Sequence, residues 1–249
     1  MITANRSDIG RVRSINEDRS WVGQLDNGIT LAIVADGMGG HQAGDVASQL
    51  AVEAFRETLS ESASKEGLTV DEGKMLIRQA ILRANDAVYD IASRNEQYHN
   101  MGTTIVATLH VNREVIIGHI GDSRAYRITQ NRIEQLTEDH TLVNELVKSG
   151  QVTAEEAAHH PRRNVITRAV GTDAEVEVDV QTLTLAEGDI LLLCSDGLSN
   201  MVSDEVMLLM VSNPDSDLDT KAERLIQLAL HAGGDDNITV VLLQDEAAN

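Results

Sequence analysis

Short apolar runs that stop at aspartate, asparagine or glycine constrain the fold of this chain more than any other feature of the sequence. Each run has the length of one strand and is rich in Val, Ile and Leu, a pattern typical of buried β-structure. The turn-forming residues at their ends separate one run from the next. The sequence therefore predicts buried strands at Ile29–Ala35, Thr103–His110, Val115–Ile120, Ile190–Cys194 and Ile238–Leu243.

Two further segments are also predicted to be strands. Arg124–Ile128 follows the turn residues Gly121 and Asp122, so it is expected to continue as a hairpin partner of the preceding strand. Glu175–Leu183 alternates strictly between polar and apolar residues, which suits a strand with one exposed face.

Helical spacing of apolar residues appears in four places. Ser203 offers a plausible N-cap for one of these helices, and the Gly233-Gly234 pair is a natural stop for the last. The predicted helices are Asp45–Leu59, Leu76–Ala92, Ser203–Val211 and Leu218–His231.

The order of these elements predicts an α+β fold. Two long helices follow the first strand, and a run of strands then follows the helices, which does not fit the regular alternation of a doubly wound parallel sheet. The chain shows neither an internal repeat nor a low-complexity linker, and it contains only two prolines. With 249 residues and 42% hydrophobic content, we expect a single domain over residues 1–249.

One segment, at about residues 138–172, stands apart from this pattern; we call it the flap segment. It contains two short helical patterns, Thr141–Lys148 and Thr153–His159, followed by a local cluster of Arg162, Arg163 and Arg168. We interpret the flap segment as an insertion packed on the main body. An ordinary pair of surface helices is the alternative.

Composition narrows the classes of partner. Lys and Arg number 20 against 40 Asp and Glu, so the formal net charge of −20 disfavours binding to nucleic acid or to an anionic membrane. The single cysteine, Cys194, lies in an apolar run and is expected to be a buried structural thiol. Neither a signal peptide nor a membrane span of about 20 apolar residues is apparent, and a cytoplasmic location is expected.

Aspartates stand at four of the predicted strand boundaries. Any one of them could be ordinary turn chemistry, since Asp-Gly and Asp-Asn are common in turns. Antiparallel strands, however, can place the end of one strand beside the start of its neighbour, so the carboxylates would converge at one sheet edge. Clustered carboxylates repel one another and need cations, and oxygen ligands suit Mg²⁺, Mn²⁺ or Ca²⁺. The aspartates are Asp36, Asp122, Asp196 and the pair Asp235 and Asp236.

The stretch "VADGMGGH" (residues 34–41) admits two interpretations, a phosphate-cradling glycine loop or a metal ligand at a strand end. It fits neither G-x-x-x-x-G-K-[ST], because lysine is missing, nor G-x-G-x-x-G, because Gln42 stands where glycine is required. The chain also lacks the G-x-S-x-G turn of serine hydrolases. The metal-ligand interpretation is therefore favoured.

Together these motifs resemble the metal-dependent protein phosphatases of type 2C (the PPM family), in particular its compact bacterial members, which oppose Ser/Thr protein kinases. The resemblance implies two antiparallel β-sheets packed face to face and flanked by helix pairs, a four-layer αββα sandwich with a metal centre at one end. The matching stretches run in order through nearly the whole chain: "RVRSINEDR" (11–19), "VADGMGGH" (34–41), "MGTT" (101–104), "HIGDSRAYR" (119–127), "TEDHT" (137–141), "CSDGL" (194–198) and "GGDDNITVV" (233–241).

The resemblance also implies a binuclear Mn²⁺ or Mg²⁺ centre and, in bacterial members, a third and weaker ion. By this resemblance Asp36 bridges the two ions, the Gly37 carbonyl binds one of them, and Asp196 and Asp236 hold the other. Glu17, with Asp18 nearby, contacts a metal through water, and Asp122 binds the third ion together with Asp196. Arg13 matches the arginine that binds the substrate phosphate.

By the same resemblance, hydroxide held between the two ions attacks phosphorus in line, without a phosphoenzyme. Many eukaryotic members have a histidine as general acid where this chain has Met38, which cannot donate a proton. His41 and metal-bound water are the candidate substitutes. We interpret His119 and His140 as structural.

The resulting expectation is a monomeric phosphatase that acts on phosphoserine and phosphothreonine proteins, including a Ser/Thr protein kinase. Two alternatives stay open from the sequence. One is a phosphatase dedicated to a single regulatory antagonist protein, and the other is an inactive member that only binds phosphoproteins. The filled ligand positions disfavour the inactive member.

Overall fold

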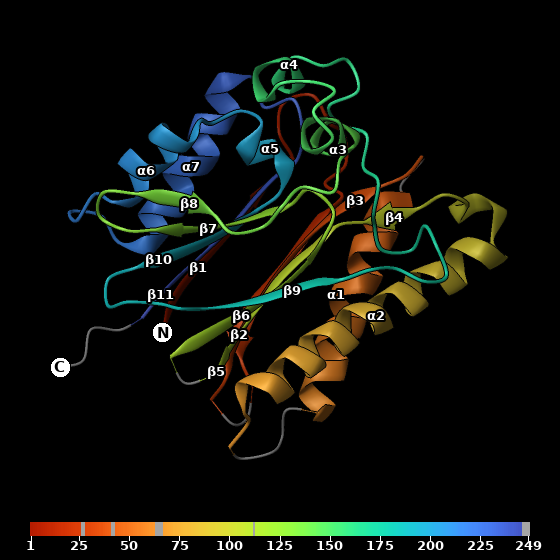
Figure 1. Ribbon diagram of the computed structural model, residues 1–249, viewed down its shortest axis with the longest axis horizontal. Helices are drawn as coiled ribbons and strands as arrows, with labels where there is room; N and C mark the ends of the chain where they lie inside the picture. Colours follow the sequence, from red (N-terminus) through yellow and green to blue (C-terminus); the bar gives the residue numbers. More distant parts are fainter. Residues whose placement is uncertain (26–27, 41–42, 63–66, 112, 246–249) are drawn as a thin grey trace.

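The computed structural model describes residues 1–25, 28–40, 43–62, 67–111 and 113–245. Within them, two antiparallel sheets pack face to face (Figure 1). One sheet has the order β1 (Ile2–Asp8), β11 (Ile238–Gln244), β10 (Ile190–Cys194), β7 (Arg124–Ile128), β8 (Ile133–Gln135). The other has the order β2 (Asp18–Gln24), β3 (Thr30–Met38), β5 (Ile105–Val111), β6 (Glu114–Ile120), β9 (Asp179–Thr184), and β4 (Gly102–Thr103) pairs with the end of β3.

Helices cover the outer face of each sheet, which completes the four layers that can be followed in Figure 1. The long helices α1 (Ala43–Ser62) and α2 (Val70–Arg94) lie on the β2–β9 sheet, and the short η1 (Glu96–Tyr98) follows α2. The other sheet is covered by α5 (Asp196–Ser199), α6 (Asp204–Val211) and α7 (Leu218–Ala232). This is the predicted αββα sandwich, and the α+β fold class is confirmed.

Side-chain alternation along the strands explains why three hydrophobic layers form. In β3, Leu31 and Ile33 pack toward α1 and α2, whereas Ala32 and Val34 pack between the sheets. In β10, Leu192 packs toward the α5–α7 layer while the residues on either side of it face the opposite sheet. Because both faces of these strands are buried, their sequences are continuously apolar rather than alternating.

The predicted strands are largely confirmed, but one predicted pairing is wrong, and of the described strands β1, β2 and β8 were not predicted. β10 matches its predicted bounds to the residue, and β3, β6 and β11 differ by a few residues at their ends. β7 was expected to form a hairpin with the preceding strand. Instead β7 pairs with β10 and β8, while β6 pairs with β5 and β9 in the other sheet. The turn at residues 121–123 therefore crosses between the sheets.

Local capping signals agree with most helix boundaries. α2 begins in a capping box, in which the Thr69 side chain accepts from the Glu72 amide and the Glu72 side chain accepts from the Thr69 amide. α7 ends at Gly233, whose φ of 146° is readily adopted only by glycine. Ser203 occupies the predicted N-cap position of α6, although its side chain makes no capping hydrogen bond.

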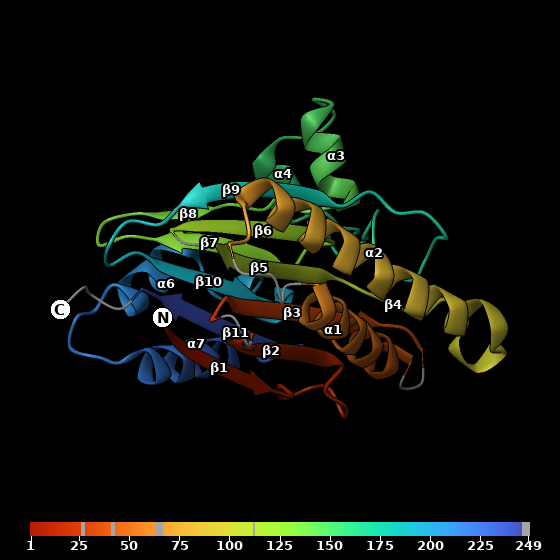
Figure 2. The same ribbon diagram turned by 90° about the horizontal axis from the view of Figure 1, so that it is seen from below.

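The flap segment forms the predicted pair of short helices, α3 (Leu142–Lys148) and α4 (Ala154–Ala158). They project from the sandwich (Figure 2) and lie beside α5 (Figure 1). Thr141 and Thr153 cap the two helices. Among the described helices, none has the length and apolar character needed to cross a membrane.

Candidate metal centre

Carboxylates from both sheets meet at one end of the sandwich. Asp36 lies near the end of β3, Asp196 follows β10, Asp236 precedes β11, and Asp122 lies in the turn between β6 and β7. Burial, followed by the charges of Asp18, Asp196, Asp122 and Asp236, raises the pKa of Asp36 well above its usual value. The expected convergence therefore occurs, but at the end shared by two sheets rather than at the edge of one.

The backbone around Asp36 is held by threonines of the "MGTT" stretch. The Asp36 amide donates to Thr104 Oγ1 over 3.0 Å, and Thr103 Oγ1 and the Thr104 amide both donate to the Asp36 carbonyl over 2.9 Å. Thr104 Oγ1 in turn lies 2.7 Å from Ser123 Oγ, next to Asp122. These bonds fix the end of β3 relative to the β6–β7 turn.

Gly37 is required because three chain segments come very close together beside it. A side chain at Gly37 would come within 2.0 Å of the Gly44 carbonyl oxygen and 2.7 Å of the Glu17 carbonyl oxygen. The Gly37 amide also donates to the Glu17 carbonyl over 3.1 Å. The glycines thus bring the start of α1 and the Glu17 backbone directly against the end of β3.

Asp18 is buried inside the carboxylate cluster, where its backbone pairs with Asp36 across β2 and β3. Its Oδ2 accepts a hydrogen bond of 2.7 Å from Ser195 Oγ, while its Oδ1 has no hydrogen-bond partner among the described residues. Burial raises the pKa of Asp18 to about 7, and the charges of Asp196 and Asp236 add to this effect. A buried carboxylate oxygen without a protein partner is suited to contact a cation or a bound water molecule.

The loop that carries Arg13 and Glu17 is tied down by Asn237. The Asn237 side chain accepts from the Glu17 amide over 2.7 Å and donates to the carbonyls of Ile9 and Ile15 over 2.9 and 3.0 Å. This one amide therefore sets the path of residues 9–17. Sequence reasoning did not identify the roles of Asn237, Ser195 and Thr104, because their partners lie far away along the chain.

Arg13 faces the cluster from the solvent side. Its Nη2 donates to Asp236 Oδ2 over 2.7 Å, and its side chain is 47% exposed. An exposed guanidinium beside acidic groups is able to turn toward an incoming anion. Asp235, by contrast, is exposed to solvent, and we assign it no role in the cluster.

Asp122 and Asp196 border an open cleft beside the flap segment. Burial, followed by the charge of Asp196, raises the pKa of Asp122 to about 7, while burial and Asp236 raise the pKa of Asp196 to about 6. The cleft has a volume of about 430 Å³ and is walled on its far side by Val143 of α3 and Ala157 of α4. It leads from solvent to the carboxylates.

The donor set fits hard divalent cations. Asp18, Asp36, Asp122 and Asp196 all have raised pKa values for the same two reasons, lost hydration and mutual repulsion. Divalent cations would relieve both, and oxygen ligands of this kind suit Mn²⁺ and Mg²⁺. His41 lies outside the described residues, and Met38, partly buried against Gly102, offers no proton.

Comparisons with known proteins identify the family of the chain. A family model described as Protein phosphatase 2C matches residues 10–223. The serine/threonine phosphatase stp of Listeria welshimeri is 41% identical over 239 residues, covering 96% of this chain and 94% of that protein. The protein phosphatase PhpP of Streptococcus pneumoniae is 40% identical over 239 residues, covering 95% and 94%.

Solved structures give the same result. The serine/threonine phosphatase of S. agalactiae aligns with a TM-score of 0.92 at 40% identity over 98% of this chain and 99% of that one. The catalytic domain of the phosphatase PstP, solved with two manganese ions, aligns with a TM-score of 0.83 at 38% identity over 97% and 96%. The chain therefore belongs to the protein phosphatase 2C family and is a metal-dependent protein phosphatase of the bacterial serine/threonine type.

Proposed function

We propose that this phosphatase hydrolyses phosphoserine and phosphothreonine side chains by direct attack of water, using two tightly held Mn²⁺ or Mg²⁺ ions and a third, weaker one. The observation that carries the proposal is the carboxylate cluster, in which burial and mutual repulsion raise the pKa values of four aspartates. The manganese-bound PstP structure supports it. In this proposal residues 1–249 form one catalytic domain, with the flap segment as an insertion.

The proposed ligands follow the sequence prediction. Asp36, the carbonyl of Gly37, Asp196 and Asp236 would hold the two tightly held ions. Glu17 would act through water, and Asp122 with Asp196 would hold the third ion. When bound, the ions would lower the pKa of a water molecule and neutralise the phosphate dianion.

The remaining steps fall to other side chains. Arg13 binds two phosphate oxygens with its planar guanidinium after leaving its contact with Asp236. Asp18 orients the attacking water with its free Oδ1, because Ser195 occupies Oδ2. None of these side chains is assigned as the group that protonates the leaving serine or threonine oxygen, and His41 remains the predicted proton donor.

Activity with and without metal tests the proposal. Hydrolysis of a phosphothreonine peptide should require added Mn²⁺ or Mg²⁺ and stop in chelator. Asp236→Asn should lower kcat/KM by at least about 10²-fold, since it removes a ligand charge. Asp235→Asn is the matched control, because that exposed neighbour should tolerate the same change. Full activity in chelator, or equal losses in the two variants, would overturn the assignment.

We further propose that the physiological substrates are several phosphoproteins, including a Ser/Thr protein kinase, rather than one dedicated antagonist protein. The relatives carry general names, serine/threonine phosphatase for one and protein phosphatase for the other, which favours several substrates over one dedicated partner. Rates on a panel of unrelated phosphopeptides should fall within about tenfold of one another. One substrate preferred by more than about 100-fold would favour the dedicated phosphatase instead.

A further inference from the structure

His140 lies at the base of the flap segment and is bonded to the turn that carries Asp122. The His140 amide donates to the Gly121 carbonyl over 2.9 Å, and the Gly121 amide donates to His140 Nδ1 over 3.0 Å. Backbone and imidazole together therefore hold the residue next to Asp122. His140 is only 4% exposed, so water cannot easily replace these bonds.

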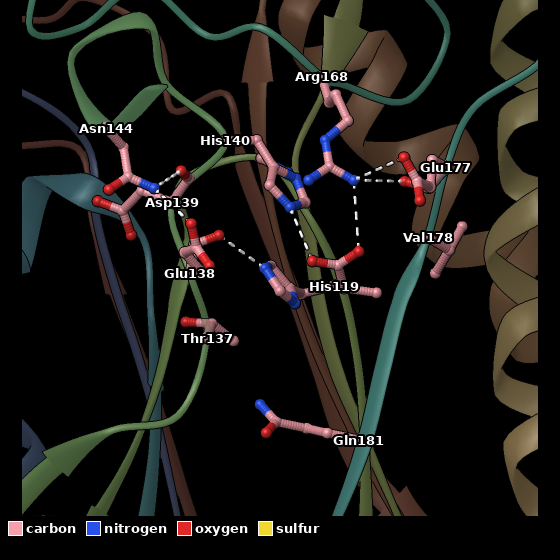
Figure 3. A network of polar contacts seen from close by, with 12 residues as sticks. His119, Thr137, Glu138, Asp139, His140, Asn144, Arg168, Glu177, Val178 and Gln181 are labelled. Carbon is pink, nitrogen blue, oxygen red and sulfur yellow. Dashed lines mark hydrogen bonds and ion pairs between the residues drawn. The ribbon is translucent and has the colours of Figure 1, made fainter. Parts of the chain in front are cut away.

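The opposite edge of the same imidazole holds the flap segment to β9. His140 Nε2 lies 3.2 Å from Asp179 Oδ2, and Arg168, at the other end of the flap segment, contacts Asp179 Oδ1 over 3.3 Å (Figure 3). The Thr167 amide also donates to the His140 carbonyl over 2.8 Å. Both ends of the flap segment thus converge on His140 and Asp179.

The hydrogen bonds fix the tautomer of the ring. Because Nδ1 accepts from the Gly121 amide, the proton of the neutral ring is on Nε2, which donates to Asp179. His119, stacked on His140 with ring centroids 4.7 Å apart, likewise donates from Nε2 to the Glu138 carbonyl over 2.9 Å. Burial lowers the pKa of both histidines, which agrees with neutral rings.

This tautomer argues against a transition-metal site at the same place. His119, His140 and Asp179 offer ligand atoms within 4.8 Å of one another. A metal ligand needs a free nitrogen lone pair, however, and both nitrogens of His140 are already committed, one as acceptor and one as donor. The cluster is better suited to hold three chain segments in fixed relative positions.

We propose that His140 is a positioning residue that places the Gly121–Asp122 turn for cation binding and links that placement to the seating of the flap segment. The inference rests on the proposed function, because it takes Asp122 as a ligand. Nδ1 serves the metal side of the link and Nε2 serves the flap side. Binding of the weaker ion should therefore order the base of the flap segment, and release of the flap segment should weaken that ion.

The two sides can be separated by substitution. In His140→Asn the side-chain oxygen stands near the place of Nδ1, so the bond from Gly121 is kept and the contact with Asp179 is lost. In His140→Gln the amide group stands near the place of Nε2, so the contact with Asp179 is kept and the bond from Gly121 is lost. Asp179→Ala removes the flap contact without touching Gly121.

Calorimetric titration of chelator-stripped protein with Mn²⁺ reads the metal side. The weakest binding event should weaken by about tenfold in His140→Gln and by at most about threefold in His140→Asn. Limited trypsin cleavage at the exposed Arg162 and Arg163 reads the flap side. Cleavage should be faster in His140→Asn and Asp179→Ala than in His140→Gln. Equal effects of the Asn and Gln variants on both measurements would overturn the inference.

Two controls separate this inference from the proposed function. Asp122→Asn should abolish the weakest Mn²⁺ binding event; if it does not, the ligand assignment itself is wrong. If Asp122→Asn has that effect but His140→Gln binds like the parent protein, only the positioning role is wrong. Should His140→Gln fail to fold, amide exchange of the parent protein decides, because saturating Mn²⁺ should protect both residues 120–123 and the base of the flap segment. Protection at only one of them would overturn the link.

Discussion

At the scale of single residues, the carboxylate cluster is unfavourable for folding, because it brings several buried acidic side chains close together. Asp18 and Asp36 are neighbours across two paired strands and both lie in the carboxylate cluster. The sequence marked Asp36, because an aspartate after a buried strand is conspicuous. It could not reveal that Asp18 faces Asp36, because the register of β2 against β3 is set by packing along the whole strand.

Removing one charge from this cluster should stabilise the metal-free protein. Asp36→Asn keeps the size of the side chain and removes a carboxylate that its neighbours repel, so the free energy of unfolding in chelator should rise by about 1–2 kcal/mol. Urea unfolding measures this change. Asp235→Asn should alter the same free energy by less than about 0.5 kcal/mol. Destabilisation by Asp36→Asn would show that the repulsion is not a dominant cost.

Arg13 should act through the shape of its guanidinium as well as through its charge. Arg13→Lys retains the positive charge but loses the planar pair of donors, so kcat/KM for a phosphopeptide should fall by about 10- to 100-fold, mainly through KM. Arg11→Lys makes the same change at an exposed neighbour and should leave both constants near their parent values. A similar loss in both variants would mean that general positive charge, not a phosphate contact, is what matters.

At the scale of elements, sequence reasoning succeeded where burial alone decides and failed where pairing is non-local. β10 was predicted to the residue because all five of its side chains are buried. The hairpin assignment of β7 was wrong because its partner β10 lies some 60 residues further along the chain. β1 was missed because it is an edge strand in which Ala4 alone is buried, so it lacks an apolar run.

The loop of residues 9–17 depends on one side chain from another element. Asn237→Ala removes three hydrogen bonds and leaves the Glu17 amide and two carbonyls without their partner. The free energy of unfolding should fall by about 2–4 kcal/mol, and activity should fall because Arg13 and Glu17 lose their fixed positions. Chemical denaturation and a phosphopeptide assay measure the two effects. The exposed Asn131 provides the matched control, since Asn131→Ala should change neither.

At the scale of the whole molecule, the two ends of the sandwich have different chemistry. The carboxylates lie at one end. Toward the other end, His110 of β5 is buried near the chain's amino terminus, and its Nε2 has no hydrogen-bond partner within the described ranges. Burial lowers the pKa of His110 from 6.5 to about 4. The four-layer architecture was predictable from the family resemblance, but this inter-sheet histidine was not, because its environment depends on how the two sheets are stacked.

His110 should make the fold sensitive to acid. Between pH 6.5 and about 4 the unfolded chain binds a proton at this residue and the folded chain does not, so stability falls as the pH decreases through that window. The loss should approach about 3 kcal/mol near pH 4. The difference in unfolding free energy between the parent protein and His110→Leu, measured from pH 7 to pH 4, isolates this effect from the carboxylates. A difference that does not change with pH would contradict it.

The crossing of the chain between the sheets at residues 121–123 has a mechanical consequence. Asp18 and Asp36 belong to one sheet, Asp196 and Asp236 flank strands of the other, and Asp122 lies on the short connection between them. If these residues hold the ions as proposed, the ions would join the two sheets at this end of the sandwich. Sliding one sheet against the other would then break contacts between metal and ligand, so metal binding should stiffen the sandwich against shear in addition to its proposed role in hydrolysis.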